Sequence, residues 1–286
     1  MIIDFHTHIF PETIRKNREK FFTGEPAFKL LYNSEKSKLA GADDIVSVMS
    51  EEGVDISIVF GFPWKNPDTA RMHNDYIIAS VGKYPEQLKG FCCVDPSWHG
   101  AADEVERCLE AGLSGVGELA FYNSGIDQDT IENLEPLMAL CLEKEVPILI
   151  HTNEPVGHQY PGKTQITLSE IYNLAAQFPD NNLVLAHWGG GIFFYMHLKK
   201  EVKNTLKNVY YDTAASPFLY NTKIYRSALL LAGKDKILFG SDYPLLKPSR
   251  YFQEIEKEGL PEDDRAKLLG ENAANLLGIL DRENNK

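Results

Sequence analysis

Two histidines near the start of the chain, His6 and His8, are separated by one residue in the stretch MIIDFHTHIF. The stretch is rich in β-branched and aromatic residues and ends at Pro11, a composition typical of a β-strand. Residues two apart on a strand point to the same face, so both imidazoles are expected on one side. Two neutral imidazoles on one face can bind a single metal cation.

Imidazole and carboxylate groups also lie at the ends of four later apolar runs. These residues are Glu118, His151, His187 and Asp242. Both side-chain types suit Zn²⁺ and related divalent ions. Each residue alone has an ordinary structural explanation, such as a helix cap or a turn hydrogen bond. Together they indicate a metal site, because a charge buried at the mouth of a fold must be paired or must bind an ion.

Short apolar runs recur along the chain, and stretches with helical periodicity separate them. The runs span residues 2–8, 55–62, 88–95, 113–121, 146–152, 182–190, 208–215 and 236–242. Alternating strands and helices predict parallel βαβ units, and eight units predict a closed (β/α)8 TIM barrel. In such barrels the chemistry lies at the C-terminal ends of the strands, which is where the six candidate residues fall.

Two segments depart from this repeat. Residues 10–40 are long and charged, and we expect them to form an excursion after the first strand, near the barrel mouth. Residues 260–280 are expected to form a short helix, a glycine break and a terminal helix packed on the barrel. No linker is evident, so residues 1–286 are expected to form a single domain. The competing fold, an open doubly wound sheet, would need a glycine-rich turn after the first strand, and the chain has none there.

The composition restricts the class of partner. The net charge is −12 over 286 residues, which argues against nucleic acid as the main partner and favours a small-molecule substrate. The four cysteines form no C-x-x-C pair, so we expect reduced, partly buried thiols in a cytoplasmic protein. Neither a leader-like segment nor a long apolar segment is present, so no membrane association is expected. A homo-oligomer is left open.

Five motifs together resemble the amidohydrolase superfamily of metal-dependent TIM barrels: HTH, GVGELAF, ILIHT, LVLAHWGG and LFGSDYP. The GSDYP motif and the tail ENAANLLG are most similar to the amidohydrolase-related branch that includes aminocarboxymuconate-semialdehyde decarboxylase. The resemblance covers nearly the whole chain. It implies a distorted barrel with a divalent metal cofactor, for which Zn²⁺ is our first expectation and Mn or Fe the alternatives.

The resemblance also implies a role for each candidate. His6, His8 and His151 match metal ligands, and Asp242 matches an aspartate that binds metal and shuttles a proton. His187 matches a histidine that activates water or substrate in one-metal members and binds a second ion in two-metal members. Glu118 matches a carboxylate that binds or bridges metals in relatives such as the TatD-like hydrolases. We expect Glu118 to contact the metal, with the orientation of a histidine or of the substrate as the alternative, and we expect one ion rather than two.

Other polar and aromatic residues near the expected strand ends are candidates for substrate binding. Asn153 and His158 follow the run at 146–152, Trp64 follows the run at 55–62, and Trp188 follows His187. For the two tryptophans, ordinary core packing is an equal alternative.

These observations predict a metal-dependent hydrolase that attacks an amide, lactone or ester carbonyl with a metal-activated water. Asp242 would accept the proton and His187 would stabilise the developing charge. A metal-dependent, non-oxidative decarboxylase is the first alternative. The ligand set does not separate the two, but no arginine lies at a strand end to bind a substrate carboxylate, since Arg71 and Arg250 lie elsewhere. A TatD-like nuclease and a non-catalytic metal-binding protein are the remaining alternatives.

Overall fold

The computed structural model describes residues 1–122, 124–198 and 200–279. Eight parallel strands follow one another around the sheet in sequence order. They are β1 (Ile3–His8), β2 (Ile56–Phe60), β3 (Leu88–Cys92), β4 (Gly115–Leu119), β5 (Ile148–Ile150), β6 (Leu183–Leu185), β7 (Val209–Asp212) and β8 (Ile237–Leu238). The N–H of Phe5 donates to the carbonyl of Phe239, and a parallel bridge joins Thr7 to Tyr243. The result is a nearly closed TIM barrel, as the sequence predicts.

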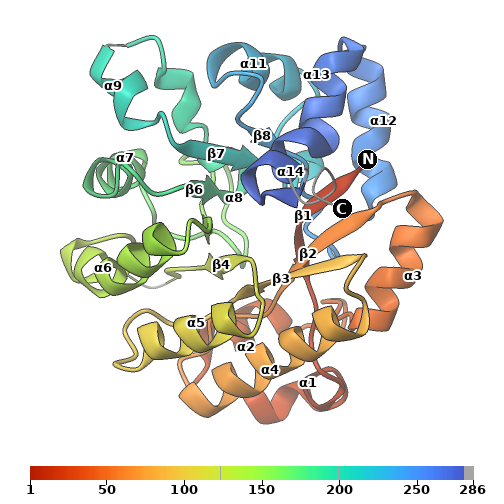
Figure 1. Ribbon diagram of the computed structural model, residues 1–286, viewed down its shortest axis with the longest axis vertical. Coiled ribbons are helices and arrows are strands. Elements are labelled where there is room, and N and C mark those ends of the chain that lie inside the picture. The colour runs from red at the N-terminus through yellow and green to blue at the C-terminus, as the bar shows by residue number, and fades with distance from the viewer. Residues whose placement is uncertain (123, 199, 280–286) are drawn as a thin grey trace.

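Helices surround the strands (Figure 1). Those that follow the successive strands are α3 (Ala42–Glu52), α4 (Pro67–Lys83), α5 (Ala101–Glu110), α6 (Gln128–Glu143), α7 (Leu168–Gln177), α9 (Lys200–Thr205), α11 (Ile224–Leu231) and α12 (Pro248–Glu258). Shorter turns are α8 (Ala186–Gly189), η2 (Ile192–Tyr195) and α10 (Ser216–Leu219). Side-chain caps fix several starts: Asp127 accepts the N–H of Thr130 before α6, and Thr167 and Glu170 form a capping box at α7. Such caps satisfy N–H groups that have no partner inside the helix.

The strands are buried because helices and loops cover them. Every residue of β2 and of β4 is buried, which explains why these strands read as near-continuous apolar runs. The main hydrophobic cluster joins strand residues to helices α3–α7, α11 and α12. A second cluster joins Phe5, Phe60 and Phe91 to Ala273 and Ala274 of α14 (Asn272–Leu276). The last helix therefore packs onto the strands themselves.

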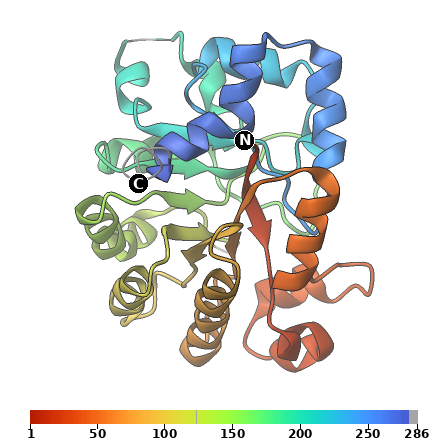
Figure 2. The ribbon, with the colours of Figure 1, turned by 45° about the vertical axis from the view of Figure 1, so that its right-hand side comes forward.

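The expected excursion after β1 is present and has its own small core. It contains α1 (Glu12–Lys16), η1 (Arg18–Phe21) and α2 (Pro26–Tyr32), which lie beside α4 (Figures 1 and 2). Phe28 packs there with Phe10 and Trp64. The N–H of Phe10 donates to the carbonyl of Ala40 over 2.7 Å, so the excursion leaves and re-enters the barrel at one point.

The expected glycine break in the C-terminal run is wrong. α13 (Glu262–Ala266), η3 (Lys267–Glu271, one π-helical turn) and α14 follow one another without interruption. Gly270 lies inside the π turn, where a Cβ atom would lie 2.4 Å from the carbonyl oxygen of Met1. The glycine is therefore needed for close approach to the start of β1. Residues 280–286 lie outside the described part of the chain.

The four cysteines, Cys92, Cys93, Cys108 and Cys141, are free and buried, in agreement with the expectation of reduced thiols. Among the described residues, none of the helices combines the length and the apolar character needed to cross a bilayer.

Candidate metal and active site

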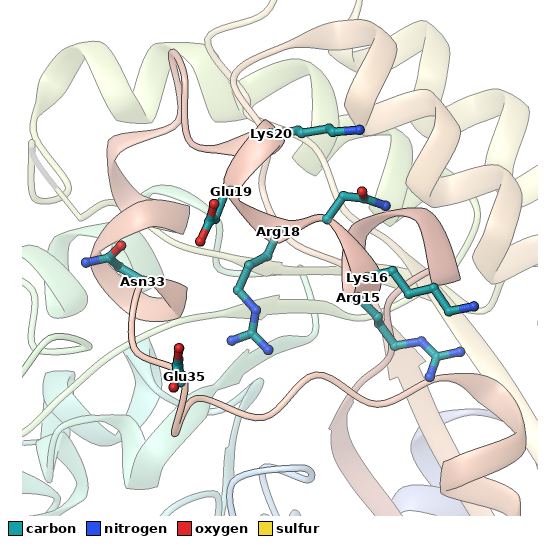
Figure 3. A pocket seen from close by; sticks show the side chains of 8 residues that line it. Arg15, Lys16, Arg18, Glu19, Lys20, Asn33 and Glu35 are labelled. Carbon is teal, nitrogen blue, oxygen red and sulfur yellow. The ribbon is translucent and has the colours of Figure 1, made fainter.

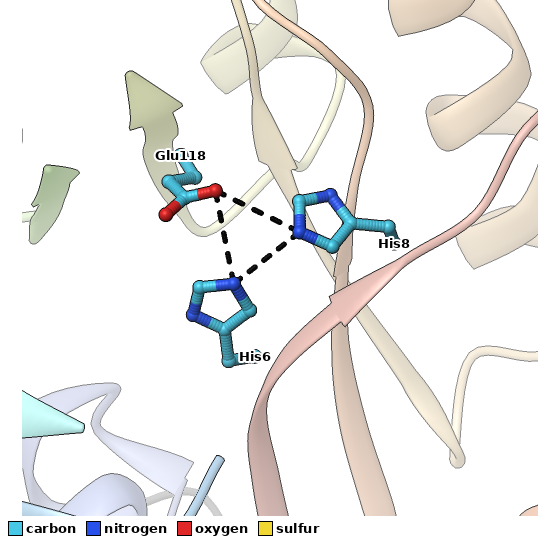
Figure 4. A group of neighbouring side chains, drawn as sticks. All are labelled: His6, His8 and Glu118. Carbon is cyan, nitrogen blue, oxygen red and sulfur yellow. Dashed lines mark hydrogen bonds and ion pairs between the residues drawn. The ribbon is translucent and has the colours of Figure 1, made fainter. Parts of the chain in front are cut away.

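His6 and His8 converge on one point at the end of β1 (Figure 4). Their Nε2 atoms lie 3.3 Å apart, which confirms that the two rings share a face. Glu118, from the end of β4, directs its Oε2 atom at both rings, 3.7 Å from Nε2 of His6 and 3.6 Å from Nε2 of His8. Three potential ligands from two strands are thus brought together.

Glu118 also reaches the opposite side of the site. Its other oxygen, Oε1, lies 2.9 Å from Nδ1 of His151 and 3.5 Å from Nε2 of His187. His151 follows β5, and His187 follows β6. The carboxylate therefore lies between two pairs of histidines, one pair facing each oxygen. In this structure His151 meets the other site residues through Glu118 and His187, and not through His6 and His8 directly.

Asp242 completes the group from the loop after β8. Its Oδ1 lies 3.5 Å from Nε2 of His8 and 3.8 Å from Nε2 of His6. The backbones of Asp242 and His187 are left-handed, with φ angles of 59° and 55°. For residues other than glycine this conformation costs about 1–3 kcal/mol, and such residues cluster at functional sites. The N–H of Asp242 donates to the carbonyl of His6 over 2.9 Å, which holds this loop against β1.

All four histidines are anchored through the ring nitrogen that faces away from the site. Nδ1 of His8 and of His187 contact the carbonyls of Gly61 and Ala214, at 3.3 and 3.1 Å. Nε2 of His151 contacts the carbonyl of Gly162 at 2.9 Å, and Nδ1 of His6 contacts Oδ2 of Asp212 at 2.7 Å. Each acceptor requires an N–H on that outer nitrogen. The inner nitrogen of a neutral ring then presents a lone pair to the site, which is how metal-binding imidazoles are oriented.

When the four rings are neutral, lone pairs and carboxylates line the interior of the site, so a proton or a metal ion can bind there. Burial lowers the pKa of His6, but the charges of Asp212 and Glu118 outweigh it and raise the pKa to about 10. Burial opposes ionisation of Glu118, yet the neighbouring His6 and His151 hold the pKa of this carboxyl well below its usual range. The carboxylates that stabilise a proton on His6 would equally stabilise a metal ion in its place. Three overlapping sets of its side chains could hold a metal ion: His6, His8 and Glu118; His6, His187 and Asp242; and Glu118, His151 and His187.

The sequence analysis missed Asp212, a fully buried carboxylate at the end of β7. Besides its contact with His6, its Oδ1 accepts the N–H groups of His187 and Ala214, over 2.8 and 3.0 Å. A signal was available in the sequence, because Asp212 directly follows the residues Val209, Tyr210 and Tyr211 within the run at 208–215.

The structure gives three of the four residues expected to bind substrate hydrogen-bond partners outside the histidine cluster, and their substrate contacts stay a prediction. Trp64 is buried and donates its Nε1–H to His73, and Trp188 is buried and donates its Nε1–H to Ser216. This favours the core-packing alternative for both tryptophans. Asn153 is buried, and its Oδ1 accepts the backbone N–H and the hydroxyl of one residue, Thr164. His158 lies in an exposed stretch of the loop between β5 and α7.

An open cavity in the excursion is separate from the histidine cluster. It has a volume of about 420 Å³ and lies within the excursion, where charged side chains of both signs surround it (Figure 3). Its lining includes Arg15, Arg18, Glu19 and Glu35, and none of the candidate site residues.

Comparison with known proteins identifies the family to which this chain belongs. The amidohydrolase family model matches residues 3–279, and the chain belongs to this family. It is thus an enzyme of the amidohydrolase superfamily, as the motifs indicated.

Curated relatives are decarboxylases. The chain is 27% identical over 259 residues to a gamma-resorcylate decarboxylase of Polaromonas sp. (strain JS666 / ATCC BAA-500), covering 74% of this chain and 77% of the relative. It is 24% identical to a 2-amino-3-carboxymuconate-6-semialdehyde decarboxylase of Dictyostelium discoideum, covering 97% of this chain and 91% of the relative. A dihydroxybenzoic acid decarboxylase from Polaromonas sp. JS666, solved with manganese and the inhibitor 2-nitroresorcinol, superposes with a TM-score of 0.72 at 21% identity, covering 97% of each chain.

These relatives overturn the expectation of a hydrolase. The same metal ligands can serve hydrolysis and decarboxylation. Hydrolysis was favoured only because no arginine lies at a strand end. That argument fails because a carboxylate can also be bound by a metal ion and by neutral hydrogen-bond donors. The comparisons support a divalent metal but not zinc in particular, since the relative's structure contains manganese.

Proposed function

We propose that this protein is a metal-dependent, non-oxidative decarboxylase of a small aromatic carboxylate. The observation that carries the proposal is the orientation of the four site histidines, whose outer nitrogens are anchored and whose inner nitrogens face the carboxylates of Glu118 and Asp242. The names of the relatives supply the reaction class. The match to residues 3–279 supports treating residues 1–286 as one catalytic domain.

His6, His8, His151 and Asp242 would hold the ion, with Glu118 as a further ligand or close neighbour. When bound, a divalent metal such as Mn²⁺ would supply a Lewis acid that holds the substrate carboxylate. Three of these five residues are buried, and the side chains of His8 and Asp242 are only 13% and 15% exposed. Most water is thereby excluded from the reacting carbon.

Asp242 is proposed to deliver the proton. In its protonated form, the carboxyl oxygen not directed at the histidines donates a proton to the ring carbon that bears the carboxylate. The bond between that carbon and the carboxylate then breaks, its electron pair returns to the ring, and CO₂ leaves. Solvent restores the proton on Asp242. Nε2 of His187 faces the same space and would hydrogen-bond a substrate oxygen.

The test is product analysis in D₂O with Mn²⁺-loaded protein. A panel of hydroxybenzoates is incubated, and CO₂ release and deuterium at the vacated ring carbon are measured, with nitrophenyl esters and lactones as comparison substrates. We expect one CO₂ and one deuterium per product molecule. Hydrolysis of an ester or lactone, with no CO₂ from any carboxylate, would refute the proposal.

A further inference from the structure

Three aromatic side chains from separate parts of the chain gather beside the histidine cluster. Tyr122 follows β4, and its ring centroid lies 5.4 Å from that of His151. Phe62, after β2, lies nearly parallel to Tyr122, with centroids 6.4 Å apart. Tyr32, the last residue of α2, packs its edge against Phe62 at 6.3 Å. The excursion thus contributes one wall of this aromatic group.

The hydroxyl groups of Tyr32 and Tyr122 have no hydrogen-bond partner among the described residues. Burial raises the pKa of both phenols, and the negative charges of Asp242 and Glu118 raise them further. The ring contacts connect Tyr122 directly to His151 and connect Tyr32 to Tyr122 through Phe62. A phenol is protonated near neutral pH, so both hydroxyls can donate a hydrogen bond.

Two cations that lie near this region already have partners. Arg18, visible in Figure 3, donates through Nη1 to the carbonyls of Tyr32, Ser34 and Ser37, over 3.4, 3.3 and 2.7 Å. Lys163 pairs with Glu154 at 2.8 Å. Among the described residues, no lysine or arginine forms an ion pair with the site carboxylates Glu118 and Asp242.

We propose that the hydroxyls of Tyr32 and Tyr122 bind a ring hydroxyl of the substrate, so that the enzyme prefers hydroxylated benzoates to benzenedicarboxylates. The proposal rests on the decarboxylase function proposed above. A phenolic oxygen can accept from two neutral donors at little desolvation cost. A second carboxylate would be buried without a cation, beside Glu118 and Asp242, which is strongly unfavourable. The aromatic side chains at this end of the site favour a flat ring packed beside them.

The orientation of Tyr32 depends on the excursion. Its ring lies 4.8 Å from Phe28 and 5.3 Å from Phe10, and Arg18 binds its backbone carbonyl. Replacing the tyrosine by phenylalanine keeps these ring contacts and removes only the hydroxyl. The substitutions Tyr32→Phe and Tyr122→Phe therefore test the donors while retaining the packing.

The experiment compares two ligands that differ by one ring hydroxyl. Binding of 2-nitroresorcinol and of 2-nitrophenol to Mn²⁺-loaded protein is measured by calorimetry, for the wild type, Tyr32→Phe, Tyr122→Phe and the control Tyr172→Phe. The hydroxyl of Tyr172 faces Thr205, remote from the site. We expect each site variant to lose about tenfold in affinity for 2-nitroresorcinol and little for 2-nitrophenol. With a hydroxybenzoate substrate, KM should rise by a similar factor while kcat changes little.

Equal affinities of wild type and both site variants for 2-nitroresorcinol would overturn the inference, as would tighter wild-type binding of benzene-1,3-dicarboxylate than of hydroxybenzoates. Binding is measured without turnover, so the two proposals fail separately. Tyrosine-dependent binding without CO₂ release would refute the decarboxylase function and support the tyrosine pair. CO₂ release with an unchanged KM in both tyrosine variants would support the decarboxylase function and refute the role of the tyrosine pair.

Discussion

The Oδ2 atom of Asp212 lies 2.7 Å from Nδ1 of His6, while Oδ1 of the same carboxylate accepts the backbone N–H of His187. One side chain on β7 thus fixes the ring of His6 on β1 and the backbone turn at His187 after β6. Both oxygens act as acceptors, and the carboxylate is fully buried. The arrangement assigns Asp212 the task of orienting two site histidines without facing the metal itself.

The substitution Asp212→Asn tests this task. An amide offers only one oxygen, so either His6 or the N–H of His187 loses its acceptor. We expect affinity for Mn²⁺ to fall about 10–100-fold, the usual effect of losing a group that orients a metal ligand. Calorimetric titration of metal-free protein measures it. Asp264→Asn, which removes an ion pair with Lys234 away from the barrel mouth, is the control. Unchanged affinity in Asp212→Asn would show that the contact is dispensable.

The fold was predictable because each barrel unit leaves a periodic signal. All eight observed strands lie inside the apolar runs identified from the sequence. The excursion was recognised only as an interruption of that pattern, since its helices are short. Its internal packing, and hence the position of Tyr32 beside Phe62, depends on contacts between segments far apart in the chain. No local pattern encodes such contacts.

The candidate site was predictable in residue identity but not in geometry. Strand ends meet at one rim, so His6, His8 and Glu118 could be grouped before the structure was known. Which oxygen of Glu118 faces which ring, and which nitrogen of each ring is anchored, depends on barrel register and loop conformation. The roles of these residues as metal ligands and proton donors stay predictions, which metal titration and activity assays of single variants can test.

The roles of metal binding and proton transfer should separate in two variants. Asp242→Asn keeps an oxygen that can bind the ion but loses the acidic proton. We expect it to retain metal while kcat for CO₂ release falls about 10²–10⁴-fold, the typical contribution of a general acid. The double variant His6→Ala with His8→Ala should lose the metal. Elemental analysis and a CO₂ assay on both proteins measure the difference. Near-normal turnover by Asp242→Asn would mean that another group supplies the proton.

His73 should make stability fall at mildly acidic pH. Its Nδ1 accepts the indole N–H of Trp64 over 2.9 Å, and its Nε2–H donates to the carbonyl of Ile9 over 2.7 Å. Burial lowers its pKa from 6.5 to about 4. Between these values the unfolded chain binds a proton that the folded protein does not. The contribution of neutral His73 to the free energy of unfolding is therefore fully present above pH 6.5. It is lost as the pH falls to 4, by roughly 3 kcal/mol in total.

Urea unfolding at pH 5 and pH 7 measures this effect in the wild type, in His73→Gln and in the control His158→Gln. The glutamine at position 73 does not titrate, so the difference in unfolding free energy between the two pH values should shrink. The exposed His158 should make no such difference. An identical pH dependence in all three proteins would assign the acid sensitivity to other groups.

Glu118 lies between the two pairs of histidines, and this position bears on the number of ions. Its Oε2 is 3.6 Å from Nε2 of His8, and its Oε1 is 2.9 Å from Nδ1 of His151. A carboxylate in this position could bridge two ions about 3.5–4 Å apart, the separation found in two-metal sites. It could equally support a single ion held by the histidines and Asp242.

We expect one ion per chain, because the GSDYP and ENAANLLG motifs resemble the decarboxylase branch, in which many members use a single metal. Glu118→Gln removes a negative charge next to His6 and His8, so it should weaken Mn²⁺ binding about 10–100-fold while the stoichiometry stays at one. Titration of metal-free protein gives both quantities. Glu154→Gln is the control, since Glu154 lies near the same rim but pairs with Lys163. A wild-type stoichiometry of two that falls to one in Glu118→Gln would contradict the single-ion site. It would establish Glu118 as a bridge, with His151 and His187 holding the second ion.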